Sequence, residues 1–183
     1  MLKQPILRIA LVALTMLLPG LVDRAFAQSA FPDPARVRID MDHVLKGRVN
    51  RQGDLVGMHH APSAPKTLIV GNRAARVHIE RAAGGPDEVS TARIQLLDPK
   101  TREVLLEKSS TLYPDSWTPQ EIEEAIREAS ASALKKRTVD NRGRWQGRTA
   151  GGVRIDGYLT YDGRGIATAF PVYAPRKQGS SRR

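Results

Sequence analysis

The sequence predicts an α+β domain built mainly from antiparallel β-sheet with a few helices. Short stretches with alternating or β-branched residues recur between turn-forming residues, as expected of strands. One later stretch has helical spacing behind a strong N-terminal capping signal. No internal repeat, glycine-rich phosphate loop, nucleophile elbow or Cys-X-X-Cys pair is present. The common nucleotide-binding, hydrolase and zinc-ribbon folds are therefore disfavoured.

Residues 1–27 are typical of a secretory signal peptide. Lys3 and Arg8 precede an apolar run from Ile9 to Val22, and Ala25-Phe26-Ala27 supplies small residues before a cleavage point. A permanent membrane anchor is disfavoured because the run is shorter than the ~20 residues of a spanning helix and contains Pro19-Gly20. We expect cleavage after residue 27, a secreted or periplasmic location, and no membrane attachment afterwards.

The mature chain is expected to be strongly basic and free of disulfides. The full sequence has 29 Lys and Arg against 19 Asp and Glu, a net charge of +10, and no cysteine. Loss of three basic residues and one acidic residue with residues 1–27 leaves +8. Such a charge attracts nucleic acid, anionic lipid or acidic polysaccharide, and by itself does not choose among them.

The middle of the chain is expected to form a single domain over residues 37–173. Residues 28–36 contain two prolines and no periodicity, which indicates a short linker, and residues 174–183 indicate a basic disordered tail. Strands are predicted at Lys66–Val70, Ala75–Glu80, Thr91–Asp98 and Glu103–Lys108.

The second half of the domain adds a helix and a hairpin. Thr118-Pro119-Gln120-Glu121 is a capping box with proline at the first helical position, and apolar residues follow at helical spacing. Val153–Tyr161 and Gly165–Val172 flank Asp162-Gly163, a dipeptide that readily adopts the positive φ angles of a tight hairpin turn. The domain is therefore expected to end on a β-hairpin.

Three of the four histidines, His43, His59 and His60, lie within eighteen residues. RNA can be cut without a metal when one imidazole removes the ribose 2′-OH proton and a second protonates the departing 5′-oxygen. A third donor must then stabilise the phosphoryl charge. The same histidines with Asp42 or Asp54 would equally suit a divalent metal, and surface histidines on glycine-rich loops would be inert. Spacing alone leaves these three interpretations open.

The blocks around the histidines resemble the bacterial EndoU nucleases, which often occur as toxin domains of contact-dependent inhibition proteins. The similarity starts with His43-Val-Leu-Lys-Gly47 and Gly57-Met-His59-His60, and continues in the family's order through Ser110 to Trp117, Gly152 to Tyr158, and Ile166 to Tyr173. The resemblance covers nearly the whole mature domain. It implies an EndoU-like, BECR-type RNase fold.

The resemblance also implies catalytic roles. His43 and His59 match the family's acid and base pair, and His60 becomes an auxiliary neighbour that contacts substrate. Animal and viral relatives add a catalytic lysine, for which the sequence alone indicates no equivalent. We therefore assign the third catalytic role to Thr168, whose hydroxyl would donate to the phosphate or base.

Three aromatic residues complete the expected substrate site. Strand alternation places Phe170 on the same face as Thr168, where its ring would stack on a base. Some family members have tyrosine at that position, so Tyr158 and Tyr173 are the expected sources of a hydroxyl. Trp145, with the arginines near it, would either contact RNA or belong to a solvated face.

The implied function is a secreted endoribonuclease, formally an RNA lyase, that leaves 2′,3′-cyclic phosphate ends and needs neither a metal nor another cofactor. Because an internal RNase would harm its producer, export suggests a toxin. RNA and an acidic immunity protein are then the expected partners. The alternatives are a basic exported module that binds nucleic acid or polysaccharide without catalysis, and a metal-dependent hydrolase that uses His59, His60 and an aspartate.

Overall fold

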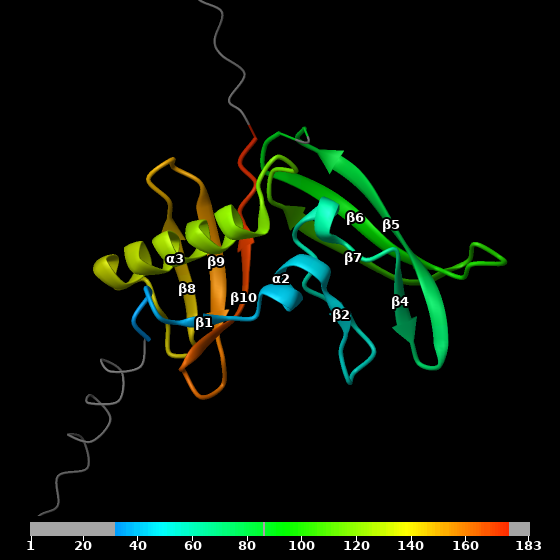
Figure 1. Cartoon of the computed structure of the whole chain (residues 1–183), viewed down its shortest axis with the longest axis horizontal. Coiled ribbons are helices and arrows are strands. Elements are labelled where there is room, and N and C mark those ends of the chain that lie inside the picture. Colours follow the sequence, from blue (N-terminus) through cyan, green and yellow to red (C-terminus); the bar gives the residue numbers. More distant parts are fainter. Residues whose placement is uncertain (1–31, 86, 176–183) are drawn as a thin grey trace, which may run out of the picture.

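The computed structural model, which describes residues 32–85 and 87–175, contains two four-stranded sheets with a short helix between them (Figure 1). All sheet pairings are antiparallel except that of the first strand with the last. The predicted α+β class, with mainly antiparallel sheet and a few helices, is confirmed. The predicted signal peptide and residues 176–183 of the predicted tail lie outside the described residues.

The elements follow one another along the chain as β1 (Arg38–Ile39), α2 (Met41–Lys46), β2 (Arg48–Val49), β3 (Leu55–Val56), η1 (Ala61–Ser63), β4 (Thr67–Val70), β5 (Arg73–Ala83), β6 (Ser90–Leu97), β7 (Val104–Leu112), α3 (Pro119–Lys136), β8 (Arg144–Arg148), β9 (Arg154–Leu159) and β10 (Gly165–Pro171). One sheet has the order β4-β5-β6-β7 and is called the long sheet below. The other has the order β1-β10-β9-β8 and is called the helix-covered sheet. Strands β2 and β3 form a small ribbon of their own.

The long sheet contains the four strands predicted in the middle of the sequence. β5 and β7 extend further than expected, to Ala83 and Leu112. One face is apolar and packs against the segment that contains the histidines. The buried core on this side consists of Leu55, Met58, Ala75, Ala92, Ile94, Leu96 and Leu112.

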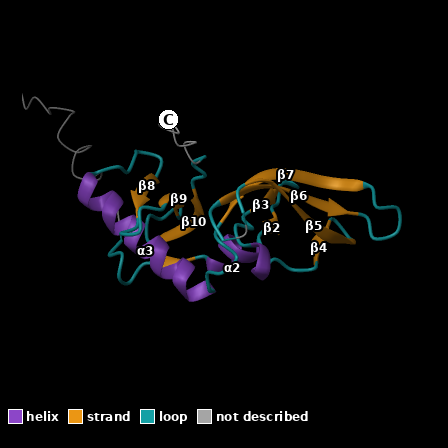
Figure 2. Ribbon diagram, turned by 90° about the horizontal axis from the view of Figure 1, so that it is seen from above, coloured by secondary structure: helices purple, strands orange, loops and turns teal. Residues whose placement is uncertain are grey.

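The helix-covered sheet packs one face against α3, which lies along one side of β8, β9 and β10 (Figure 2). Two glycines make this close packing possible. A Cβ atom on Gly147 would lie 1.8 Å from the Ala129 carbonyl oxygen of α3, and one on Gly157 would lie 2.3 Å from the Trp145 ring. Trp145 is fully buried in this layer, so both expected placements, in contact with RNA and on a solvated face, were wrong.

The helix α3 begins where the capping box predicted. The Thr118 hydroxyl accepts from the Glu121 amide, and the Glu121 carboxylate accepts from the Thr118 amide at 2.6 Å. Tyr113 is fully buried and its ring stacks on Trp117 at 6.0 Å, so both anchor the core. Of the described residues, no helix is both long and apolar enough to cross a membrane.

The terminal hairpin forms as predicted, but its turn differs. Gly163 alone takes a positive φ, of 69°, and Asp162 does not. The Gly163 amide donates to the Thr160 carbonyl at 2.8 Å, and the Asp162 carboxylate accepts from the Thr160 hydroxyl. The extra residues between the strands allow one glycine to reverse the chain, so two positive φ angles are not needed.

Candidate active site

The two histidines of the implied pair are brought together by the end of a six-residue helix. The Asp40 carboxylate caps α2 by accepting from the His43 amide at 3.1 Å. At the other end, carbonyls of the helix accept from the later segment: Met58 donates to the His43 carbonyl at 3.1 Å and His59 donates to that of Val44 at 2.7 Å. The helix end and the second histidine are therefore fixed to one another through their backbones.

This junction demands an unusual backbone. Gly57 has a φ of 74°, and a Cβ atom there would lie 2.0 Å from the His43 carbonyl oxygen. The next residue, Met58, has a φ of 62° although it carries a full side chain, and it is completely buried. A bulky residue in the left-handed region is strained, and the packing around Met58 holds it there. The strain lies immediately before His59.

His59 is held on two sides. Its Nδ1 lies 2.9 Å from the Thr111 carbonyl oxygen and 3.1 Å from the Ser110 Oγ, while its ring stacks on Phe170 at 5.5 Å. The carbonyl can only accept, so Nδ1 carries the proton and donates. The other ring nitrogen, Nε2, then has the lone pair. Contacts from the long sheet and from β10 thus orient this imidazole as a proton acceptor.

A lysine that the sequence analysis missed completes the cluster. Lys108 of β7 lies opposite Ile94, on the buried face of the long sheet. Its Nζ donates to the Gly57 carbonyl, and its charge acts on both His43 and His59. An ammonium has three protons, so one bond to Gly57 leaves two for a ligand. Strand alternation assigns Lys108 and Ser110 to the apolar face of β7. Two polar residues at such positions were the sequence signal that could have revealed this lysine.

The environment favours neutral imidazoles. Burial, with help from Lys108, lowers the pKa of His59 to about 3, while its bond to Thr111 acts in the opposite direction. Burial also lowers the pKa of His43, and the Arg48 guanidinium adds to this while Asp40 opposes it. Burial lowers the pKa of Lys108 to about 8, so its ammonium remains mostly charged at neutral pH. A bound phosphate would raise all three values.

His60 points into a different cluster from its neighbour. Its Nδ1 lies 2.7 Å from the Ser63 Oγ, and the residue is 2% exposed. Burial lowers its pKa, against which the Asp115 charge acts, and Asp115 is paired with Arg81. Successive residues of an extended chain face opposite sides, which explains the separation from His59. Its predicted substrate role therefore lacks support from this packing.

The remaining predicted residues lie on or just after the helix-covered sheet. Thr168 and Phe170 occupy the same face of β10, and Thr168 is the cross-strand partner of Tyr158. Tyr158 is 39% exposed, and Thr168 and Phe170 are partly exposed. Tyr173 is partly buried beyond the end of β10. The structure thus brings Phe170 to His59. Thr168 lies two residues before Phe170 on the same strand face, with Tyr158 opposite it on β9.

The structure also bears on the two other interpretations of the histidines, inert surface residues and a metal site. The idea of inert surface histidines was wrong, because His43 and His59 are each only 8% exposed. The metal interpretation requires His59 and His60 with an aspartate. Across residues 32–85 and 87–175, no group of three or more His, Cys, Asp or Glu side chains is arranged to hold a metal ion.

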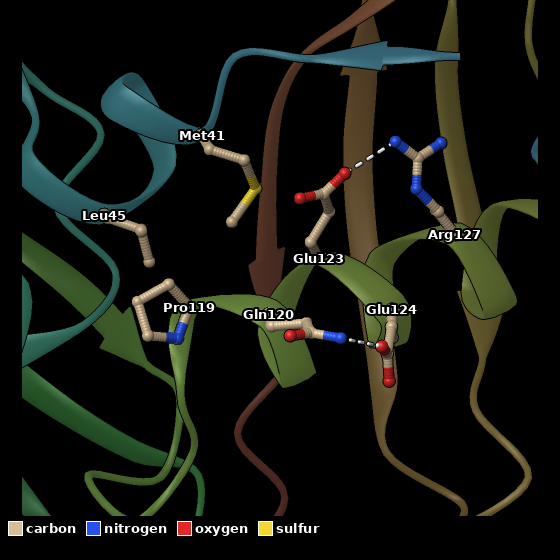
Figure 3. A pocket seen from close by; sticks show the side chains of 7 residues that line it. All are labelled: Met41, Leu45, Pro119, Gln120, Glu123, Glu124 and Arg127. Atoms are coloured by element: carbon tan, nitrogen blue, oxygen red, sulfur yellow. Dashed lines mark hydrogen bonds and ion pairs between the residues drawn. The ribbon is translucent and has the colours of Figure 1, made fainter. Parts of the chain in front are cut away.

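A separate groove of about 520 Å³ lies between α2 and α3. Figure 3 shows its lining of Met41, Leu45, Pro119, Gln120, Glu123, Glu124 and Arg127. Two of its polar contacts run along α3: Arg127 to Glu123 at 2.6 Å and Gln120 to Glu124 at 2.9 Å. Arg127 also donates to the Pro34 and Val37 carbonyls and so holds the start of the described chain. The groove contains none of the paired histidines.

Comparison with known proteins decides the family. A sequence model described as bacterial EndoU nuclease matches residues 38–173, which include the histidine pair, Lys108 and both sheets. The chain belongs to the bacterial EndoU nuclease family. A Bacillus cereus protein named "Toxin" is 28% identical over 139 residues, which make up 72% of this chain and 22% of that protein. The chain therefore spans about a fifth of this relative's length. No solved structure matches significantly.

Membership in the EndoU nuclease family confirms the resemblance, and it identifies the chain as a nuclease with the α+β fold expected of that family. The matched region begins at β1 and ends just after β10, so the whole described fold apart from its ends belongs to the nuclease.

Proposed function

We propose that this EndoU nuclease is an exported endoribonuclease that cuts RNA by acid and base catalysis between two histidines. The observation that carries the proposal is the convergence of His43, His59 and Lys108 on one buried junction. Two imidazoles and a cation are the groups that metal-free cleavage of RNA requires.

His59 is the general base in this mechanism. Its proton on Nδ1 is committed to the Thr111 carbonyl, and its low pKa keeps Nε2 unprotonated at neutral pH. Nε2 removes the proton of the ribose 2′-OH, and the 2′-oxygen attacks the adjacent phosphorus. The bond from phosphorus to the 5′-oxygen breaks, and protonated His43 donates a proton to that oxygen. The products are a 2′,3′-cyclic phosphate and a 5′-hydroxyl.

Lys108 takes the third role in place of the residue expected from the sequence. Its ammonium would stabilise the negative charge that builds on the phosphoryl oxygens during attack. Thr168 stays in the proposal as a donor to the phosphate or base, and Phe170 as the stacking platform. Tyr158 and Tyr173 remain candidates for hydroxyl contacts with the substrate.

The biological role proposed is that of a toxin delivered outside the producing cell. Two observations support it: the Bacillus cereus relative is named a toxin, and residues 1–27 have the pattern of an export signal. A toxic nuclease requires protection of the producer. An acidic immunity protein suits this basic chain, because opposite charges steer association.

The test is cleavage of single-stranded RNA by the purified protein in EDTA, with analysis of the new ends. Wild-type protein should leave 2′,3′-cyclic phosphates, and a substrate with a 2′-deoxy sugar at the cleavage site should survive. His43→Ala and His59→Ala should each lose at least about a hundredfold in rate. His78→Ala is the matched control, because His78 is an exposed histidine on β5.

Two results would contradict the proposal. Intact RNA with retained binding would indicate a binding module without catalysis. Activity that disappears in EDTA and returns with zinc or manganese would indicate a metal-dependent hydrolase.

A further inference from the structure

The face of the helix-covered sheet opposite α3, called the open face below, carries a second set of polar and aromatic side chains. Strand alternation and register place them together: Arg144, Gln146 and Arg148 from β8, Arg154, Asp156 and Tyr158 from β9, and Thr168 and Phe170 from β10. The other face of the same strands holds Trp145, Gly147 and Gly157. Figure 2 shows α3 along this sheet. The open face is thus the side that the helix leaves uncovered.

The composition of the open face suits a single-stranded nucleic acid. It has three arginines, one aspartate and two aromatic rings. Grooves that bind single strands combine positive charge for the backbone with aromatic side chains on which bases stack. Arginine also presents planar donors that match phosphate oxygens.

A buried carboxylate fixes two of these arginines in place. Asp156 is 2% exposed and accepts from Arg144 Nη2 at 3.0 Å, from Arg154 Nε at 3.2 Å and from Gln146 Nε2 at 2.8 Å. The Arg144 and Arg154 side chains remain 45% and 41% exposed. Each guanidinium has five N–H donors, so most remain for a ligand. Arginines that are already held in place lose less freedom on binding.

The open face is continuous with the catalytic histidines. Phe170, which stacks on His59, is the cross-strand partner of Asp156, and Asp156 is the partner of Gln146. The next row runs from Thr168 through Tyr158 to Arg144. Neighbouring strands lie ~4.8 Å apart, so each row extends about 10 Å across the sheet from β10, the strand that contacts His59.

We propose that the open face binds the stretch of single-stranded RNA next to the scissile phosphate. Arg144 and Arg154 contact backbone phosphates, Tyr158 stacks on a base, and Asp156 positions the two guanidiniums. This inference rests on the proposed ribonuclease function and adds a subsite remote from the reacting atoms. It predicts that cleavage of long substrates depends on Arg144 and Arg154 and that cleavage of the shortest ones does not.

The experiment compares two substrates with the same single cleavable ribose: a dinucleotide, and a single strand of about twelve nucleotides. kcat/KM is measured for the wild type, Arg144→Gln, Arg154→Gln and the control Arg76→Gln, an exposed arginine of β5 on the long sheet. Thermal melting of each variant verifies that it is folded.

Each open-face variant should lose about tenfold in kcat/KM for the long substrate and less than about twofold for the dinucleotide. The salt dependence of log kcat/KM should also fall by about one unit of slope per arginine. Arg76→Gln should change neither rate. Equal losses on both substrates, or no loss on the long one, would overturn the proposal.

Asp156→Asn distinguishes a role of Asp156 in positioning the two guanidiniums from an effect of its negative charge alone. The change makes the open face more positive, so charge alone predicts faster cleavage of the long substrate. Positioning predicts slower cleavage through a higher KM with unchanged kcat, because the guanidiniums lose their anchor. A lower KM in a folded variant would contradict the positioning role.

If the wild type cleaves neither substrate, the ribonuclease proposal fails, and fluorescence anisotropy with the long strand decides the rest. Binding that weakens in Arg144→Gln and Arg154→Gln but not in Arg76→Gln would still support the open face as the RNA site. Binding that is absent, or equal in all variants, would overturn it.

Discussion

The two sheets of this nuclease differ in where they carry polar residues. The helix-covered sheet follows strand alternation: its α3 side is apolar and glycine-containing, and its other side carries the charges. The long sheet breaks the rule in β7, where Lys108 and Ser110 replace apolar residues on the face that packs against the core. Both exceptions contact the segment from Gly57 to His59.

The difference shows where each part of the chemistry comes from. A partly buried lysine is costly for folding, and such violations of local rules are expected at functional sites. The long sheet supplies a partly buried positive charge beside the histidine pair, and the helix-covered sheet offers an exposed surface for substrate. Substitutions of the polar residues in the long sheet should lower activity without lowering stability. Substitutions on the open face of the helix-covered sheet should change how activity depends on RNA length.

The largest effect is expected for Lys108→Met. Loss of the cation should reduce kcat by about a hundredfold to a thousandfold. The free energy of unfolding should not decrease, because the burial that lowers the Lys108 pKa to about 8 is a penalty on the charged form. Steady-state kinetics and urea unfolding measure the two quantities, with the exposed Lys135→Met on α3 as control. A variant that is inactive because it is unfolded would make the role of Lys108 structural.

A comparison of two glycines tests the junction between the histidines. Gly57→Ala would place a Cβ atom against the His43 carbonyl oxygen, whereas Gly53 has a φ of 90° with open space around it. Backbone strain alone should lower the unfolding free energy of each variant by about 1–2 kcal/mol. Gly57→Ala should lose considerably more, together with activity, because His43 must move. Chemical denaturation and RNA cleavage measure this; equal losses would show that the clash relaxes easily.

Phe170 tests the link between the two sheets. Phe170→Ala removes the ring stacked on His59 and should lower kcat/KM by about tenfold on every RNA, including a dinucleotide. Phe170→Tyr keeps the ring and should retain activity. Kinetics on substrates of two lengths distinguish this residue from the arginines of the open face. A loss confined to long RNA would place Phe170 with the arginines instead.

The smallest effect is a shift in pH profile. kcat/KM requires free enzyme with neutral His59 and protonated His43, so its alkaline limb follows the His43 pKa, which lies below its usual 6.5. Arg48→Gln removes a cation that lowers this pKa and frees Asp40, which raises it. The limb should move to higher pH, and only slightly, since Arg48 is half exposed. A shift of the acid limb to higher pH, with the alkaline limb unchanged, would reverse the assignment of acid and base.

Much of this protein was determined by local sequence. Alternation located β4 to β7, the capping box at Thr118 located α3, and Asp162-Gly163 located the final hairpin. Each depends on residues near one another in the chain, where backbone preference and side-chain spacing act directly. The histidine pair and the family were also evident, because the motif blocks occur in a recognisable order.

The tertiary structure decided what surrounds those histidines. Lys108 bonds to the carbonyl of a residue 51 positions earlier, and this contact depends on how β7 pairs with β6 and packs on the His59 segment. The short helix α2 is stabilised by contacts with distant backbone, so its sequence alone is too brief to predict it. Burial likewise lowers the pKa of His59. That burial comes from the whole fold packed around the imidazole, and the neighbouring residues in the sequence do not reveal it.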